Sequence, residues 1–187
     1  MTEPQPQTAA GKVLWHFTMS LDGFVAGPGH DMSWMTGFTV RPGLIGEYVQ
    51  TTGAVLAGRR GFDSAIGDVR PYGGAWQGPV FVLTHHPEDA RPAEGITILS
   101  CPVEEAVRIA LGAAEGKNVE VFSPSIGRQL LENGLIDEID LHIAPVLLGD
   151  GVRLYDNPGA EPIRLHLDGG PDPTAAVNVR YLTTVTR

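Results

Sequence analysis

Polar and apolar side chains alternate along residues 138–143, in the order Glu-Ile-Asp-Leu-His-Ile. This period of two residues is typical of a β-strand with one buried face, and it places His142 on the polar face. Gly134 precedes the strand and predicts a helix end, because glycine readily adopts the left-handed conformation that closes helices. Pro145 removes a backbone donor, so the strand must end, bulge or lie at a sheet edge there. Residues 134–150 therefore predict a helix end, a long strand and a glycine turn.

Shorter elements are expected on both sides of this stretch. Apolar runs predict strands at 13–18, 54–57, 79–83, 96–99 and 119–122, with two more near 163–167 and 176–185. Apolar side chains at helical spacing predict helices from 42 to about 50, from 102 to 110 and from 126 to 132. Residues 19–40 are glycine-rich and predict a long loop, and loops of that length in compact domains are usually functional or mobile.

The order of these elements predicts the fold class. Strands alternate with helices through the first two thirds of the chain, and strands follow strands at its end. This order is typical of a three-layer α/β fold with a mostly parallel mixed sheet, antiparallel C-terminal strands and helices on both faces. Ligands of such sheets bind at the carboxyl ends of the strands. The turns that follow Ala57, Leu83 and Phe122 should therefore lie on one edge of the sheet.

Composition and charge narrow the classes of function. A length of 187 residues, with 42% hydrophobic and 19% charged residues, suits one soluble domain at 12–187 after a flexible tail at 1–11. The net charge of −9 argues against a nucleic-acid or anionic-membrane partner. Cys101 is the only cysteine, so no intramolecular disulfide and no cysteine-based metal site is expected. The sequence shows no signal peptide and no apolar run that could span a bilayer, which predicts a cytoplasmic protein.

Two expected strand ends carry groups that could bind phosphate. Gly58, Arg59 and Arg60 follow one strand, and guanidinium groups at a strand-to-helix turn form strong hydrogen bonds to phosphate. A solvated turn with a surface salt bridge explains the same residues equally well. Thr84 and His85 follow the next strand, where they could bond a phosphate or a base edge, or simply form a turn. No metal site is expected, because adjacent histidines point to opposite sides of an extended chain.

The glycine-rich loop carries further candidates. Asp22, two residues after Ser20, is either an acid or ligand-binding group or part of an ordinary Asp-Gly turn. Trp34 either forms one wall of a pocket for a flat ring or anchors the loop in the core. For His142, on the polar face of its strand, a cross-strand or interface contact is favoured over catalysis.

Four segments in matching strand and helix context carry a family resemblance: 19–27, 56–60, 80–84 and 134–151. Together they resemble the dihydrofolate-reductase-like superfamily. They look most like the C-terminal reductase domain of the bifunctional riboflavin-biosynthesis deaminase-reductase and its stand-alone relatives. The segment at 134–151 is the most distinctive of the four, and the resemblance implies the dihydrofolate-reductase-like fold.

The resemblance implies NADPH as hydride donor and a small heterocyclic substrate, either a riboflavin-pathway pyrimidine or a pterin-like molecule. The matching cofactor positions are Ser20 at the nicotinamide, Gly58, Arg59 and Arg60 at the phosphates, and Thr84 and His85 near the adenosine ribose and its 2′-phosphate. Donors at the start of the following helix would come from Ser123, Ile126 and Gly127. Asp22 and Trp34 would face the substrate, with Asp22 as the candidate catalytic acid.

The chain also departs from the family pattern. The family usually has a Gly-Gly pair where this chain has Phe122 and Ser123, and only bare backbone gives the close approach to a pyrophosphate. The riboflavin branch has a carboxylate where Val121 stands and a basic residue where Phe24 stands. Two hypotheses follow: an NADPH-dependent reductase, or a non-catalytic ligand- or nucleotide-binding module of the same fold. A homodimer formed through the C-terminal strands is compatible with both.

Overall fold

The computed structural model describes residues 11–64, 71–90, 94–169 and 172–182. The chain separates into two compact units, residues 1–155 and 156–187. The first unit contains all the described helices and strands. The described part of the second unit contains turns, one of them closed by the Leu167 amide donating to the Pro173 carbonyl at 2.7 Å. Most of the expected N-terminal tail lies outside the described residues.

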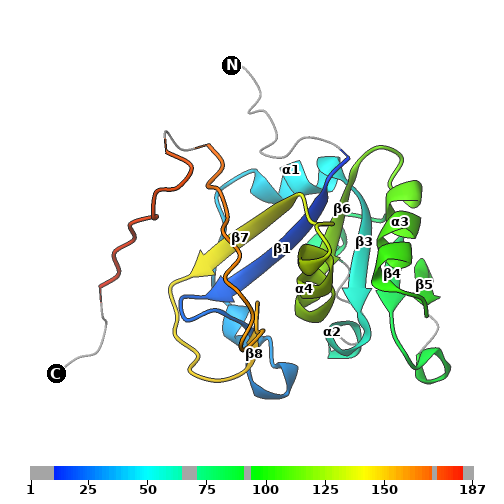
Figure 1. Cartoon of the computed structure of the whole chain (residues 1–187), viewed down its shortest axis with the longest axis horizontal. Coiled ribbons are helices and arrows are strands. Elements are labelled where there is room, and N and C mark those ends of the chain that lie inside the picture. The colour runs from blue at the N-terminus through cyan, green and yellow to red at the C-terminus, as the bar shows by residue number, and fades with distance from the viewer. Residues whose placement is uncertain (1–10, 65–70, 91–93, 170–171, 183–187) are drawn as a thin grey trace. The chain divides into compact units, whose positions relative to one another are not determined.

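A parallel sheet of six strands forms the centre of the first unit (Figure 1). Its order is β5-β4-β3-β6-β1-β7, and every neighbouring pair is parallel. The strands are β1 (Val13–Ser20), β3 (Thr52–Gly58), β4 (Val80–Leu83), β5 (Ile96–Leu99), β6 (Asn118–Phe122) and β7 (Glu138–Ala144). Two short strands, β2 (Phe24–Ala26) and β8 (Val152–Arg153), form a separate antiparallel pair.

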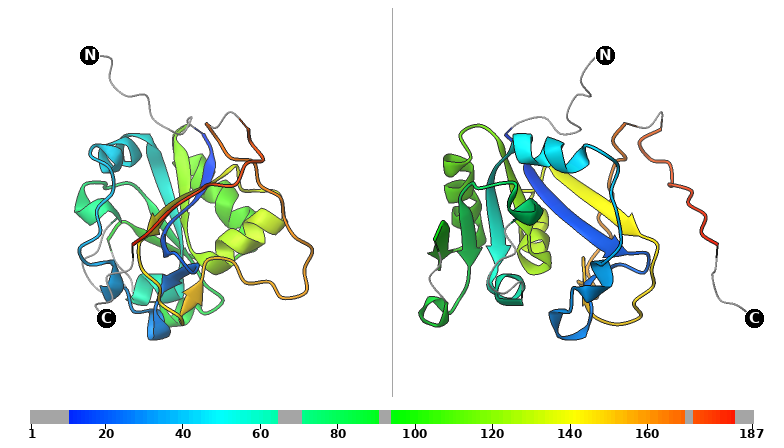
Figure 2. Two further views of the ribbon diagram at one scale, coloured as in Figure 1. Left: turned by 90° about the vertical axis from the view of Figure 1, so that its left-hand side faces the viewer. Right: turned by 180° about the vertical axis from the view of Figure 1, so that it is seen from behind.

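Helices cover both faces of this sheet. The α-helices are α1 (Leu44–Thr51), α2 (Arg59–Ser64), α3 (Val103–Ala113) and α4 (Pro124–Glu132). Short 3-10 turns are η1 (Pro28–His30), η2 (Ser33–Met35), η3 (Pro71–Gly74) and η4 (Pro87–Asp89). The helices α3 and α4 lie on one face, and the view from behind in Figure 2 shows α1 on the other. Among the described helices, none has the length and apolarity needed to cross a membrane.

The main core lies between the sheet and the pair α3 and α4. Alternate residues of β1, β3 and β6 point to this face, and helical spacing aims one stripe of each helix at them. The buried side chains of this core include Val13, Trp15, Leu56, Val119, Val121, Ala106, Val107, Ile126 and Leu130. Complete burial of a Val or Leu side chain contributes about 1.5–3 kcal/mol, so this layer supplies much of the stability of the unit.

The opposite face of the sheet is apolar at one side and polar at the other. From Val55 onwards in β3, and along β4, the buried side chains of this face are apolar, and Trp76 packs against them while its Nε1 donates to the Thr52 carbonyl at 2.9 Å. Along β1 and β6 the residues that point to this face include His16 and Glu120, both buried. Buried polar groups need hydrogen-bond partners, so this half of the sheet is where a specific polar network is required.

The predicted fold class is confirmed, and most element boundaries agree within two residues. The helix expected from residue 42 begins at Leu44, because Gly43 adopts a left-handed conformation with φ of 85°. The expected loop 19–40 is wrong in part, since it contains β2, which pairs with β8. The antiparallel pairing expected at the C-terminal end is found between β2 and β8.

The strands expected near 163–167 and 176–185 are wrong for the described residues of those segments, which adopt no strand conformation. Alternation of apolar and polar residues is only one requirement of a strand. The other is a ladder of hydrogen bonds to a neighbouring strand. The described residues of the second unit form no such ladder.

Close packing of α4 against β1 depends on Gly127. A Cβ atom at this position would lie 2.1 Å from Nε1 of Trp15, whose side chain is fully buried. Real Cβ atoms do not approach other atoms so closely, so the helix or the indole ring would have to move. Gly127 therefore sets the distance between α4 and the sheet.

We predict that Gly127→Ala destabilises the protein by about 1–3 kcal/mol, the usual effect of overpacking a well-filled core. The measurement is the free energy of unfolding in urea. Gly112→Ala is the matched control, since Gly112 also lies in a helix but a Cβ atom there would have no neighbouring atom within 4 Å. It should stabilise by about 0.5–1 kcal/mol, the ordinary helix preference for alanine over glycine. Equal stabilities of the two variants would contradict this account of the packing.

Candidate functional site

The carboxyl ends of the central strands lie on one edge of the sheet. The arrowheads of β1, β3 and β7 point to the same side in Figure 1. Gly58 pairs in register with Leu83, and Ala57 pairs with Phe122. The three turns expected to share an edge are therefore neighbours, as predicted. This edge brings together most of the candidate cofactor-binding residues.

Asp22 ties the turn after β1 to the loop that follows β7. Its carboxylate accepts the Ser20 hydroxyl at 2.6 Å, the Leu148 amide at 3.1 Å and the Gly149 amide at 2.8 Å. The Ser20 hydroxyl in turn accepts the Phe24 amide at 2.9 Å. The bond from Ser20, followed by those from Gly149 and Leu148, outweighs the effect of partial burial and lowers the pKa of Asp22 to about 2.

A carboxyl group with this pKa is ionised at neutral pH and carries no proton to donate. The geometry therefore gives Asp22 a clear role in positioning the loop at Leu148 and Gly149. Its proposed role as a catalytic acid stays a prediction, and the described contacts offer it no support. Ser20 is fully buried and reaches the same turn, where it orients Asp22.

Trp34 lies in η2 and is half-buried, with its ring centroid 6.2 Å from that of Phe38. Its Nε1 is buried and has no hydrogen-bond partner among the described residues. An unpaired buried donor costs about 1–3 kcal/mol, so a ligand acceptor that reaches it would be favoured. This observation is compatible with the predicted position beside a substrate.

Arg59 joins the start of α2 to the turn after β4. Its guanidinium bonds Asp63 at 3.0 Å, Asp89 at 3.3 Å and the carbonyl of His86 at 3.4 Å. The hydrogen bond that Arg59 donates to Asp63 is the main reason why the pKa of Arg59 is raised. The salt-bridge interpretation of this turn is thus correct for Arg59. A phosphate bound here would compete with the carboxylates of Asp63 and Asp89 for the Arg59 guanidinium.

The turn after β4 is exposed at His85 and His86, while Thr84 is half-buried. The Thr84 hydroxyl accepts the His86 amide at 3.1 Å, which shapes the turn. Three exposed side chains gather in this turn, from His86, Glu88 and Asp89. The imidazole nitrogen and the carboxylate oxygens that could bind a metal ion lie within 4.8 Å of one another. Asp89 also contacts Arg59, so this cluster forms part of an ion-pair network.

The start of α4 is closed by its own hydrogen bonds. Ser123 is buried and caps the helix, with its hydroxyl accepting the Ile126 amide at 3.4 Å and its carbonyl accepting the Gly127 amide at 2.8 Å. Pro124 has no amide hydrogen. A Cβ atom on Gly58 would lie 2.7 Å from the Ser123 hydroxyl, so the Ser123 side chain fills the space beside Gly58. The donors expected from Ile126 and Gly127 are thus used within the helix.

A second polar group of residues lies on the α1 face and centres on Glu120. This carboxylate is fully buried between β1 and β3. It accepts the Thr52 hydroxyl at 2.5 Å and the Tyr72 hydroxyl, and it contacts Nδ1 of His16 at 3.3 Å. Burial, followed by the negative charge of Glu120, raises the pKa of Tyr72 far above its ordinary value, so this hydroxyl remains a donor.

The network continues from His16 to the edge strand β7. Nε2 of His16 lies 3.0 Å from Nε2 of His142, and the Tyr48 hydroxyl lies 3.4 Å from the same His142 nitrogen. Tyr48 donates to Asp140 at 2.5 Å, and its ring stacks on His16 with centroids 4.3 Å apart. Burial is the main cause that lowers the pKa of His142, and the neighbouring His16 lowers it further. The cross-strand contact predicted for His142 is confirmed.

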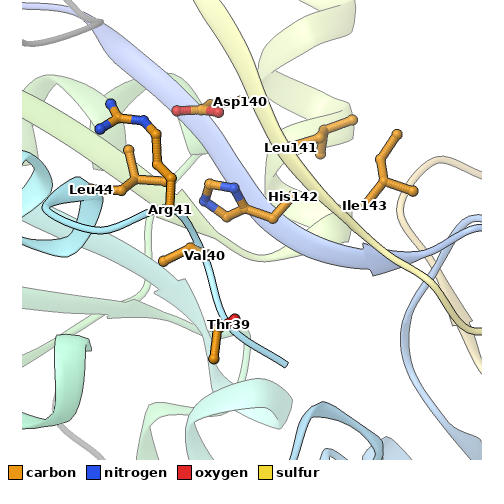
Figure 3. Close-up of a pocket in the computed structure, with 8 residues that line it drawn as sticks. All are labelled: Thr39, Val40, Arg41, Leu44, Asp140, Leu141, His142 and Ile143. Carbon is orange, nitrogen blue, oxygen red and sulfur yellow. The ribbon is translucent and has the colours of Figure 1, made fainter. Parts of the chain in front are cut away.

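A pocket of about 450 Å³ opens beside this network. Its lining comes from β7, from the segment that precedes α1 and from the first residue of α1: Thr39, Val40, Arg41, Leu44, Asp140, Leu141, His142 and Ile143. Figure 3 shows the His142 imidazole extending from β7 towards Val40 and Arg41. Arg41 forms two hydrogen bonds to Glu47, at 2.8 and 2.6 Å, which hold its guanidinium at the rim.

Sequence reasoning missed this buried network. His16, Tyr48, Tyr72 and Glu120 come from four separate segments, and only the fold brings them together. One signal was present: Glu120 stands between two valines in the otherwise apolar run at 119–122. A carboxylate in such a position must be paired when the strand is central, and the pairing partners become visible only in three dimensions.

The comparisons with known proteins agree with this fold. Residues 11–169 match the model of the RibD C-terminal domain. No curated protein sequence is significantly similar to the chain. A crystal structure from Shewanella sp. PV-4, assigned to riboflavin biosynthesis, is similar at a TM-score of 0.63 and 20% identity, over 80% of this chain and 86% of that one.

Two further solved structures share the fold. One is the diaminohydroxyphosphoribosylaminopyrimidine deaminase/5-amino-6-(5-phosphoribosylamino)uracil reductase of Thermotoga maritima, with a TM-score of 0.58, 15% identity and 82% of this chain covered. The match covers 51% of that protein, so this chain spans about half its length. The other is dihydrofolate reductase of Enterococcus faecalis in complex with NADP(H), with a TM-score of 0.53, 14% identity and 80% of each chain covered.

We predict that Asp22→Asn flattens the acid dependence of stability. The folded-state pKa of Asp22, about 2, lies below its ordinary value of 3.8. The ionised carboxylate therefore stabilises the fold fully at pH values above 3.8, and this stabilisation is lost as the pH falls towards 2. Urea unfolding midpoints measured across this range should therefore fall less steeply in the variant than in wild type. Asp168→Asn, at an exposed aspartate of the second unit, is the charge-matched control and should follow the wild-type curve. Identical acid profiles for all three proteins would rule out the loop-tying role of Asp22.

Proposed function

We propose that this chain, which belongs to the family of RibD C-terminal domains, is a reductase that uses a reduced nicotinamide cofactor, with NADPH as the first candidate. The observation that carries the proposal is the extent of the family match. Residues 11–169 include the whole sheet, its carboxyl edge and the pocket beside β7. An oxidoreductase of this fold would bind the cofactor along that edge.

The residues at the edge have the donor chemistry that an anionic dinucleotide requires. Arg59 and Arg60 bring two guanidiniums to the end of β3, and Thr84 brings a hydroxyl to the end of β4. We propose that these groups hold the cofactor phosphates and the adenosine ribose, together with Gly58 and His85. Ser20 would line the nicotinamide end. When bound, the cofactor supplies a hydride to a C=N or C=O bond of the substrate.

The substrate proposed for the pocket is a small heterocycle, a riboflavin-pathway pyrimidine or a pterin-like molecule. The Thermotoga maritima relative reduces 5-amino-6-(5-phosphoribosylamino)uracil, as its name states, and this compound is the first substrate to test. Val121 and Phe24 replace a carboxylate and a basic residue of the riboflavin branch, which favours a substrate without the full set of phosphoribosyl contacts. Cytoplasmic location and a homodimer remain part of the proposal.

A second candidate function is a non-catalytic binding module. The observation that favours it is the closed start of α4, where Ser123 caps the helix and Pro124 offers no amide hydrogen. Phe122 also favours this candidate, because its ring occupies space where the family has bare backbone. Its ring centroid lies 5.9 Å from that of His16 and 6.4 Å from that of Tyr72. A pyrophosphate would find fewer backbone donors here than in relatives with a Gly-Gly pair.

The proposal predicts that the purified chain binds NADPH and that Arg60→Gln weakens this binding by about 10–100-fold, since a charge-assisted hydrogen bond contributes about 1.5–3 kcal/mol. Nicotinamide fluorescence during titration measures the dissociation constant. Arg108→Gln, on α3 and paired with Glu105 at 3.6 Å, is the matched control and should leave the affinity unchanged. Absence of any binding at millimolar NADPH would exclude the reductase proposal.

The two candidate functions differ in what the double variant Phe122→Gly with Ser123→Gly should do. For a binding module with a blocked cofactor site, the variant gains NADPH affinity that wild type lacks, because bare backbone becomes available. For a working reductase, wild type already binds and the variant gains little. Ser123→Gly alone costs only a few tenths of a kcal/mol as a helix cap, so it separates the capping effect from the effect of the Phe122 ring.

A further inference from the structure

We propose that His142 is the catalytic residue that protonates the substrate, and that the buried pair of His16 and Glu120 supplies its proton. This inference rests on the proposed reductase function and names the proton donor that the function needs. Hydride addition to a C=N or C=O bond leaves an electron pair on the nitrogen or oxygen, so a positioned acid must deliver a proton there.

The location of His142 suits this task. It lines the pocket, and it pairs in register with Thr18 of β1, two residues before the pair of Ser20 and Ala144. Two residues of a strand span about 7 Å, so a small heterocycle could reach both His142 and the carboxyl edge of β1. Asp22, at that edge, is fully engaged as an acceptor.

The contact between the two imidazoles requires a shared proton. Their Nε2 atoms lie 3.0 Å apart, which is hydrogen-bond distance, and such a contact holds one hydrogen between the two atoms. Nδ1 of His16 faces the Glu120 carboxylate at 3.3 Å and therefore carries its own hydrogen. With the shared proton on His16, the ring is a cation beside a buried carboxylate. With the proton on His142, His16 is neutral.

Glu120 fixes where the positive charge rests. A fully buried carboxylate needs donors and a counter-charge, and it has the hydroxyls of Thr52 and Tyr72 and the ring of His16. The carboxylate is thereby tied to three separate segments of the chain and cannot turn away from His16. The extra proton is thus held on His16, and the imidazole of His142 lies between His16 and the pocket.

The other groups around His142 act on its pKa in opposite directions: Arg41 lowers it and Asp140 raises it, while burial has the largest effect. Asp140 and Tyr48 face it from β7 and α1, and Arg41 faces it from the segment before α1. The Tyr48 hydrogen points to Asp140, which accepts it at 2.5 Å. Burial and the proximity of His16 lower the pKa of His142, so its ring rests neutral.

The proposed step transfers one hydride and one proton to the substrate. The substrate carbon accepts the hydride that a reduced nicotinamide supplies, and the electron pair of the double bond moves to the nitrogen or oxygen. That atom takes the proton from Nδ1 of His142, while Nε2 of His142 receives the proton held by His16. Glu120 exchanges no proton in this step, both imidazoles end neutral, and solvent returns one proton after the product leaves.

The first experiment needs neither cofactor nor substrate. Long-range proton–nitrogen NMR of the histidine rings in the full chain reports which ring nitrogens carry hydrogen. We expect a single hydrogen between Nε2 of His16 and Nε2 of His142, and we expect Glu120→Gln to displace it, because the counter-charge is lost. Separate, independent protonation of the two rings in wild type would overturn the relay. His166→Gln, at an exposed histidine of the second unit, should leave both signals unchanged.

The second experiment uses NADPH with 5-amino-6-(5-phosphoribosylamino)uracil and with 7,8-dihydrofolate as the substrates tested. His142→Gln should lower kcat by about 100-fold or more, the usual contribution of a general acid, while the dissociation constant of NADPH stays unchanged. Wild-type kcat should fall as the pH rises and the imidazoles of His16 and His142 lose the extra proton that they share. The kcat of the variant should be independent of pH over the range in which wild-type kcat falls. His166→Gln should retain the wild-type profile.

The outcomes separate the two proposals. If wild type binds NADPH and reduces a tested substrate while His142→Gln keeps its rate and pH profile, the role of His142 is overturned and the reductase function stands. If wild type neither binds NADPH nor reduces a substrate, the proposed function fails, and the catalytic role of His142 fails with it. The NMR result then decides by itself whether the proton-sharing pair exists.

Discussion

The burial of the Glu120 carboxylate is the constraint on which the polar half of the structure depends. A charge of this kind is tolerated inside a protein only when hydrogen bonds and an opposite charge replace its water. The required groups come from three segments, with Thr52 at the start of β3, Tyr72 in η3 and His16 in β1. Loss of one partner from a buried ion pair typically costs about 3–5 kcal/mol. The carboxylate thus fixes how these segments meet, and with them the wall behind the pocket.

The two faces of the sheet have different tasks as a result. Towards α3 and α4 the side chains are apolar and close-packed, down to the contact of Gly127 with Trp15. Towards α1 the strands β1, β6 and β7 present a connected set of polar groups that ends at His142. A rigid apolar layer behind such a network holds its strands in register, and the register sets the 3.0 Å contact between the imidazoles. Stability and site geometry therefore come from opposite sides of the same strands.

The sequence predicted the strands and helices well where apolar runs were bounded by glycine or proline, as at residues 96–99 and 134–144. It failed where a strand needed a distant partner, as for β2 with β8, or lacked a described partner, as at 163–167. The turns on the carboxyl edge were predictable because parallel strands end together. The network around Glu120 was not, because its hydrogen bonds join residues up to 126 positions apart. Periodicity reports which face a residue occupies, and it carries no information on which distant residue shares that face.

The hydride and the proton of a reduction need different surroundings, and this fold offers them at different places. The carboxyl edge has guanidiniums and turns suited to an anionic cofactor, and its nearest carboxylate, Asp22, is held ionised by the hydroxyl and amides around it. In the proposed relay, the proton is held between the imidazoles of His16 and His142, beside the buried carboxylate of Glu120. A substrate bound against β7 would lie between these two sources. This separation explains why the loop around Asp22 can be fixed tightly, since the residue that orders the edge need not also exchange protons.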